Sequence, residues 1–192
     1  MAFMQQRKAM YSQRNLVLNS SAVEISEMIV RVAKKYASIM VEEYGIERIH
    51  DLVGHIVDVD ACYHSDKKIF KENLSRAIIL TYENVINSIF KVNKHKSYEF
   101  MLELKDKMLN ILDVYWIDHI SELDGLKRSS SFDKNSDPLK LYGYAANDKF
   151  YKDVIPSIYN EMLTYATNPD LKFGDYEIKF SEEAMAEQKI ML

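Results

Sequence analysis

The chain has 192 residues, 47% of them hydrophobic, which is enough to bury a substantial core as one domain or two small ones. It has only five glycines and three prolines, and because these residues mark turns, their scarcity favours long helices with few loops. The formal net charge is −4 with acidic and basic residues interspersed, which excludes the domain-wide basic field that attracts nucleic acid. We therefore expect a mainly α protein that binds no nucleic acid.

Cysteine usage and hydropathy indicate the compartment. Cys62 is the sole cysteine, which excludes an intrachain disulfide framework and fits a reducing cytosol. The first residues, MAFMQQRK, have no apolar run behind their charges, and nowhere do about 18 apolar residues follow one another. We expect a cytoplasmic protein that neither carries its own secretion signal nor spans a membrane.

The first half of the chain predicts a polar helix and then a small helical subdomain. Residues 5–18 have a polar helical pattern, and Asn19-Ser20-Ser21 supplies N-cap candidates for the next helix. Apolar residues recur at helical spacing over residues 25–40, which indicates an amphipathic helix that ends near Gly45. After a stretch with shorter patterns, helical spacing resumes over residues 66–92.

The second half predicts a long antiparallel pair of helices. Apolar spacing from Tyr98 to Leu126 describes a helix of roughly 30 residues, or about 45 Å. The stretch KRSSSFDKNSDP breaks this pattern, and Asp137-Pro138 suits the start of a returning helix, with Asp as N-cap and Pro at the first helical position. Pro156 should kink or break that helix because it lacks an amide hydrogen. Alternating residues over 171–180 predict a short strand pair or one edge strand.

One cluster on the long helix invites a catalytic interpretation. Four ionisable residues follow the only tryptophan, Trp116: Asp118, His119, Glu122 and Asp124. Residues three and four apart share a helix face and could form an acid/base pair, but catalysis also needs a cleft and substrate-holding groups, for which the sequence gives no sign. We favour a structural role, in which Trp116 packs against the partner helix and His119 lies at the edge of the seam. Trp116→Ala should then cost more stability than His119→Ala.

A second cluster could hold a metal ion. Its candidate ligands are His55, Asp58, Asp60, Cys62 and His64. Their spacing matches no closed zinc pattern, so we favour a loop of ordinary polar residues and keep a metal-dependent enzyme as a further hypothesis. The chain also lacks the G-x-x-x-x-G-K-[ST] loop that cradles a nucleoside triphosphate. We therefore expect no catalytic residue, metal ion or cofactor in this chain.

Three stretches, in order along the chain, carry a resemblance to a known family. QRKAMYSQRNLVL, from Gln6 to Leu18, resembles the QR-x-x-x-Y-x-x-R-N/R-x-x-L segment that ends the long scaffold helix of SecA, the ATP-driven preprotein translocase motor of bacteria. WIDHISELDGLK, from Trp116 to Lys127, is similar to the W-x-x-H-L-x-x-M-D-x-L-K/R stretch that opens its two-helix finger. DPLKLY, from Asp137 to Tyr142, resembles the D-P-x-x-x-Y that opens the returning finger helix.

The resemblance implies a helical scaffold with a small helical wing and a two-helix finger. It implies four segments: the end of the scaffold helix (1–18), the wing-like subdomain (19–96), the finger with its tip near 129–137 (97–168), and a tail (169–192). The Trp-His-carboxylate cluster then looks like the structural base of a mechanical lever, made by Trp116, His119, Asp124, Leu126 and Tyr142. The residues expected to contact preprotein or channel at the tip are Ser131, Phe132, Asp133 and Lys134.

The function implied by the resemblance is mechanical. Such a module transmits ATP-driven motion to a preprotein at a SecYEG-type channel during protein export, and its partners are the channel, the preprotein and the remaining SecA motor domains. ATP and Mg²⁺ would be bound in those motor domains, so this chain looks like an excised or truncated part. Its place would be cytoplasmic and peripheral at the inner face of the cell membrane, with possible contact with the membrane surface.

The sequence also departs from the family pattern. The tip stretch RSSSFDKN replaces the usual R-G-Y-x-Q-K-type loop, and the Cys-rich zinc-binding tail is absent. Such divergence resembles the accessory SecA paralogues of Gram-positive bacteria. The alternative from another class is a stand-alone helical adaptor or chaperone-like interaction module without catalysis, which the same long hairpin would suit.

Overall fold

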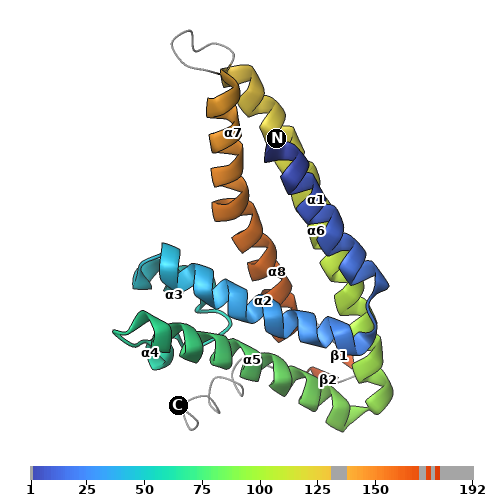
Figure 1. Cartoon of the computed structure of the whole chain (residues 1–192). Helices are drawn as coiled ribbons and strands as arrows, with labels where there is room; N and C mark the ends of the chain where they lie inside the picture. Colours follow the sequence, from blue (N-terminus) through green and yellow to red (C-terminus); the bar gives the residue numbers. More distant parts are fainter. Residues whose placement is uncertain (1, 131–137, 169–171, 174–175, 178–192) are drawn as a thin grey trace. The chain divides into compact units, whose positions relative to one another are not determined.

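The computed structural model describes residues 2–130, 138–168, 172–173 and 176–177, and the fold is mainly α, as predicted (Figure 1). Its elements are α1 (Ala2–Asn19), α2 (Ala22–Glu43), α3 (Ile46–Val53), α4 (Val59–Cys62), α5 (Lys67–Val92), α6 (Lys94–Ser130), α7 (Pro138–Lys149), the π-helix η1 (Phe150–Val154), α8 (Ile155–Thr167), β1 (Lys172–Phe173) and β2 (Tyr176–Glu177). In the tail, β1 and β2 pair antiparallel.

The chain divides into two compact units. Residues 1–20 and 105–158 form the first, which we call the hairpin unit, and residues 21–104 and 159–192 form the second, the α2–α5 unit. The long helix α6 contributes residues to both units. These cuts fall elsewhere than the four segments predicted from the sequence, whose boundaries stay a prediction.

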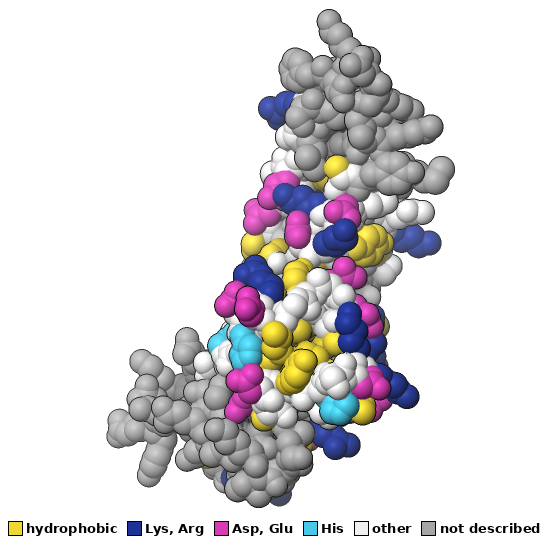
Figure 2. All heavy atoms as spheres, turned by 90° about the vertical axis from the view of Figure 1, so that its left-hand side faces the viewer, with side chains coloured by type: hydrophobic (Ala, Val, Ile, Leu, Met, Phe, Trp, Pro, Cys, Tyr) yellow, Lys and Arg dark blue, Asp and Glu magenta, His cyan; other side chains and the backbone are white. Residues whose placement is uncertain are grey.

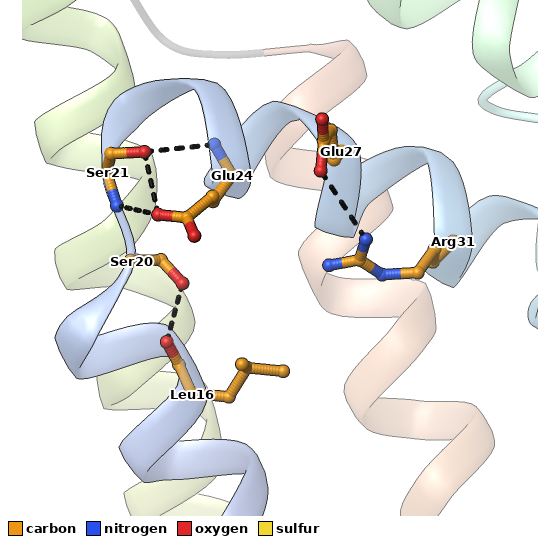
Figure 3. A network of polar contacts seen from close by, with 6 residues as sticks. All are labelled: Leu16, Ser20, Ser21, Glu24, Glu27 and Arg31. Carbon is orange, nitrogen blue, oxygen red and sulfur yellow. Dashed lines mark hydrogen bonds and ion pairs between the residues drawn. The ribbon is translucent and has the colours of Figure 1, made fainter.

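A capping box starts the first long helix of the α2–α5 unit. The Ser21 hydroxyl accepts a hydrogen bond from the Glu24 amide (3.4 Å), and the Ser21 amide donates to Glu24 Oε2 (2.7 Å; Figure 3). Each side chain thereby satisfies an amide that the first helical turn would leave without a partner. The predicted N-cap is confirmed, and α2 ends at Glu43, just before Gly45 as expected.

The core of this unit lies where α2 packs along α5. Residues at helical spacing on the two facing sides are buried: Ile25, Met28, Ile29, Tyr36 and Met40 on α2, and Phe70, Leu74, Ile78, Tyr82 and Val85 on α5. At its edge, the Tyr82 hydroxyl donates to Ser26 Oγ (3.0 Å) and Lys71 pairs with Glu42 (2.6 Å). The apolar stripes seen in the sequence therefore face each other, which is why the two helices pair.

The hairpin unit is built from three helices. α6 is a single helix of 37 residues, and α7 and η1 return alongside it (Figure 1). Lys149 at the end of α7 pairs with Glu122 of α6 (2.8 Å). α1 lies along α6, where Arg14 pairs with Asp113 (2.8 Å). The two-helix hairpin predicted from the sequence is therefore present, with α1 as a third helix beside it.

The irregularity expected at Pro156 takes the form of a π-helical turn. The amide of Ile155 donates to the carbonyl of Phe150, five residues back, and α8 then continues through Pro156. In an α-helix the ring of Pro156 would meet the carbonyl four residues earlier, and Pro156 has no amide hydrogen to donate. A wider turn immediately before the proline accommodates both features without ending the helix.

Candidate functional site at a three-helix junction

A buried glutamine joins the three helices of the hairpin unit. The side chain of Gln6, on α1, has no exposed surface. Its Nε2 donates to the carbonyl of Ala146 (3.1 Å) and to Asn147 Oδ1 (2.9 Å), both on α7. Its Oε1 lies 3.0 Å from His119 Nε2 on α6. We call these residues, together with Trp116 and Phe150, the three-helix junction.

The hydrogen bonds fix the state of His119. The carbonyl of Ala146 can only accept, so the amide nitrogen of Gln6 must face α7 and its oxygen must face α6. His119 therefore donates from a protonated Nε2. Its Nδ1 is buried and has no hydrogen-bond partner among the described residues. The junction thus holds the neutral imidazole in one tautomer.

The electrostatic surroundings agree with a neutral imidazole. Burial is the main cause that lowers the pKa of His119, which is 1% exposed. The charge of Glu122 raises this pKa and that of Lys149 lowers it. Because Glu122 and Lys149 form an ion pair with each other, the two charges largely cancel at the imidazole.

Aromatic rings surround the histidine. Trp116 stacks on Phe3 of α1, with ring centroids 5.8 Å apart, and lies 5.9 Å from the His119 ring. Phe150, the first residue of η1, lies 5.2 Å from His119 on another side. Rings at these separations bury large apolar areas and exclude water from the hydrogen bonds of Gln6. The junction is therefore suited to holding helices together.

The charged side chains of the neighbouring groove are paired with each other. It has a volume of about 290 Å³ and is lined by Met10, Tyr11, Arg14, Asn15, Leu112, Asp113 and Trp116. Its acidic and basic side chains, Asp113 and Arg14, are paired with each other through two contacts of 2.8 and 3.2 Å. General acid–base catalysis needs a group free to exchange a proton with a substrate, and a guanidinium paired with a carboxylate supplies none. A structural role fits better.

The structure brings some of the predicted site residues together and separates others. Trp116 and His119 meet in the junction, whereas the side chain of Asp124 is exposed. The prediction that His119 lies at the edge of the seam was wrong, because three helices rather than two enclose it. The side chains of Leu126 and Tyr142, and the tip residues Ser131, Phe132, Asp133 and Lys134, lie outside the described residues.

The role of Gln6 and its partners in the junction was not predicted from the sequence. Gln6 matched the scaffold-helix pattern, but its role as a buried bridge was not foreseen, and Phe3, Asn147 and Phe150 were not singled out. Gln6 stands in a polar helical stretch, where a glutamine normally faces solvent. The motif match at Gln6 was the one available signal, because its hydrogen-bond partners lie more than a hundred residues away.

Two of the candidate metal ligands, Asp60 and His55, take part in separate contacts. His50 lies 3.0 Å from Asp60, and His55 Nε2 lies 2.8 Å from the hydroxyl of Thr164. The His50–Asp60 pair links α3 with α4. The His55–Thr164 pair links the loop between α3 and α4 with α8. Each histidine therefore has a local partner that accounts for it.

The other candidate ligands also have structural roles. Asp58 caps α4 by accepting from an amide of that helix, and His64 Nδ1 accepts from the amide of Asp66 (3.0 Å). Cys62 is buried, and burial, with a smaller effect of the Asp58 charge, raises its pKa to about 12. A thiol with that pKa is a poor metal ligand at neutral pH. Within the described ranges no group of three metal-ligating side chains occurs, and the metal hypothesis gains no support.

Charges of both signs lie on the described residues of one face. On the face shown in Figure 2, acidic and basic side chains are interspersed among hydrophobic ones, in keeping with the net charge of −4. Among the helices that the structure describes, none combines the length and the apolar character needed to cross a bilayer.

Comparison with known proteins places the chain in a family. Residues 2–169 match the SecA Wing and Scaffold domain, and the chain belongs to this family. Similar curated proteins include the protein translocase subunit SecA of Buchnera aphidicola subsp. Cinara cedri, 27% identical over 88% of this chain and 20% of that protein. Protein translocase subunit SecA 2 of Clostridioides difficile is 26% identical over 76% of this chain and 20% of its own length.

A further relative, protein translocase subunit SecA of Clostridium beijerinckii, is 26% identical over 94% of this chain and 22% of its own length. The chain therefore spans about a fifth of the length of the curated relatives it matches. No solved structure matches it.

Proposed function

We propose that this chain is the scaffold, wing and finger part of a SecA-like protein translocase. In this role it couples ATP-driven motion of motor domains to the movement of a preprotein through a SecYEG-type channel. The observation that supports the proposal best is the three-helix junction. Gln6, Trp116 and His119, which carry two separate stretches of family resemblance, meet there in one buried network.

The physical properties of the hairpin unit suit a lever. Within the hairpin unit, α6 contributes residues 105–130, a helical segment about 40 Å long. The junction holds α6 and α7 to α1, the helix that resembles the end of the motor's scaffold helix. Movement of α1 would therefore carry both arms of the hairpin with it. ATP and Mg²⁺ would bind in the motor domains, and this chain would hydrolyse nothing by itself.

The partners follow from the same role. The chain would contact the motor domains, the preprotein and the channel, and would work at the cytoplasmic, inner face of the cell membrane, with possible contact with the membrane surface. The alternative, a stand-alone helical adaptor or chaperone-like module, is supported by the absence of a catalytic arrangement among the described residues.

A docking experiment separates the two functions. The nucleotide-binding and preprotein-crosslinking domains of a SecA are produced without its wing and scaffold. They are mixed with this chain, and the mixture is passed over a sizing column. We expect one complex, which Trp116→Ala should weaken by disturbing α1, while the exposed control Ile117→Ala should not. Separate elution of the chain from the motor domains at micromolar concentration would favour the adaptor.

The finger tip gives a second test. Phe132 stands among Ser and Asp residues outside the described residues, and an isolated aromatic there would suit contact with extended polypeptide of any sequence. Phe132→Ala should change the free energy of unfolding by less than about 0.5 kcal/mol and lower export by the reassembled translocase. Tyr151→Ala, which removes an exposed aromatic from the described part of the hairpin, is the matched control. Lost stability with normal export would mean that Phe132 packs against the helix ends.

A further inference from the structure

We propose that Gln6 is a positioning residue, whose amide sets where α7 lies along α1 and α6. The consequence for protein transport rests on the proposed function, but the positional inference concerns this chain alone. Of the residues that join α1 to α7 in the junction, Gln6 is the one with directional bonds to both other helices. Its amide uses both hydrogens and its oxygen in doing so.

Hydrogen bonds specify position in a way that apolar contacts do not. Gln6 contacts two consecutive residues of α7, the backbone carbonyl of Ala146 and the side chain of Asn147. A shift of α7 by one residue moves each acceptor by about 1.5 Å along the axis and turns it by roughly 100°, so both bonds would be lost. A single buried polar residue fixes helix register in coiled coils for the same reason.

The π-helix changes the register of α7 relative to α8. η1 follows α7 directly, and its wider turn offsets α7 from the position that an uninterrupted α-helix through α8 would give it. The other links to α7 are less specific. The Glu122–Lys149 pair is partly exposed, and Phe150 makes apolar ring contacts that tolerate sliding. Among these contacts, the bonds of Gln6 specify the register of α7 most narrowly.

The inference predicts a selective loss of order. Spin labels on Lys8→Cys and Ala145→Cys report the distance from α1 to α7, and labels on Lys8→Cys and Asp118→Cys report that from α1 to α6; all three positions are exposed. The buried native Cys62, with a pKa of about 12, should stay unlabelled. Gln6→Met keeps most of the volume but removes the hydrogen bonds. We expect Gln6→Met to broaden the distribution of α1–α7 distances about twofold. A core of the right volume stays folded, but without specific contacts it no longer holds its helices in a single arrangement.

The α1–α6 distribution should stay narrow in Gln6→Met, because the Phe3–Trp116 and Arg14–Asp113 contacts remain. Met10→Ala is the control: it leaves a cavity beneath the same helix but keeps the Gln6 network. If Gln6→Met leaves the α1–α7 distribution as narrow as in the wild type, or if Met10→Ala broadens it equally, the inference is overturned.

A milder pair of variants keeps the test valid if Gln6→Met does not fold. Asn147→Ala removes one bond to α7. Gln6→Glu still accepts from His119 but cannot donate to the carbonyl of Ala146. Both should broaden the α1–α7 distribution alone, and Gln6→Glu should also raise the pKa of His119, seen by NMR titration. An unchanged α1–α7 width in both variants would refute the inference. Failure of the chain to dock with motor domains would instead refute the proposed function and leave these distances unaffected.

Discussion

Trp116→Ala should lower the free energy of unfolding of the hairpin unit by about 3–5 kcal/mol, the usual cost of removing a large buried aromatic side chain. Trp116 is 9% exposed, stacks on Phe3 and contacts the ring of His119. Its removal would leave a cavity between α1 and α6 that rigid helices cannot readily close. Urea unfolding followed by circular dichroism measures the effect, because the variant has no tryptophan left to report by fluorescence.

Ile117→Ala is the matched control, since Ile117 is the next residue of the same helix and is 62% exposed. Its stability should change by less than about 0.5 kcal/mol. In the wild type, the emission maximum of Trp116 should be shifted to the blue of free tryptophan, and quenching by iodide should be weak. Emission and quenching like those of free tryptophan would mean that Trp116 does not occupy the junction.

Local signals in the sequence predicted much of the fold. Asn19-Ser20-Ser21 predicted an N-cap ahead of the second helix, and in the structure Ser21 caps α2, with Glu24 completing a capping box that was not predicted. The apolar stripes of residues 25–40 and 66–92 predicted two amphipathic helices, and these helices face each other as α2 and α5. Helix ends and apolar faces depend on residues within a few turns, which is why one sequence suffices to predict them.

The junction could not be predicted in the same way. Helical periodicity shows which residues share a face of α6, but it does not show that α1 covers one side and α7 another, so His119 was placed at an edge. The sequence predicts that Gln6 faces solvent. Its burial is possible because its amide forms hydrogen bonds with residues more than a hundred positions away in the chain. The π-turn before Pro156 was likewise hidden, because the sequence indicated a disturbance there but not its form.

Burial of His119 also changes the expected cost of replacing it. The sequence predicted that His119→Ala would be milder than Trp116→Ala. Because the ring is 1% exposed and bonded to Gln6, we now expect His119→Ala to cost about 2–4 kcal/mol at pH 7.5, from a cavity and an unsatisfied amide oxygen. His119→Gln should cost less, because its amide can donate to Gln6 Oε1 in place of the imidazole.

The two variants should also remove an acid sensitivity of the wild type. Burial lowers the pKa of His119 below the value of about 6.5 that it has in the unfolded chain, so below that pH the unfolded state binds a proton that the folded state resists. The free energy of unfolding therefore carries no penalty from His119 above about pH 6.5. It decreases as the pH falls below that value, and continues to decrease until the pH reaches the lowered pKa of the folded state. A protonated ring would also carry an Nδ1 hydrogen into a buried place where the described residues offer no acceptor.

Urea unfolding at a series of pH values between about 5 and 8, followed by the fluorescence of Trp116, reports the hairpin unit. The wild type should lose stability toward low pH more steeply than His119→Gln does. His55 also has a pKa lowered by burial but belongs to the α2–α5 unit, so His55→Gln is the control and should keep the wild-type slope at Trp116. If His119→Gln keeps that slope as well, then another group governs the response, and His119 is not held neutral by the junction.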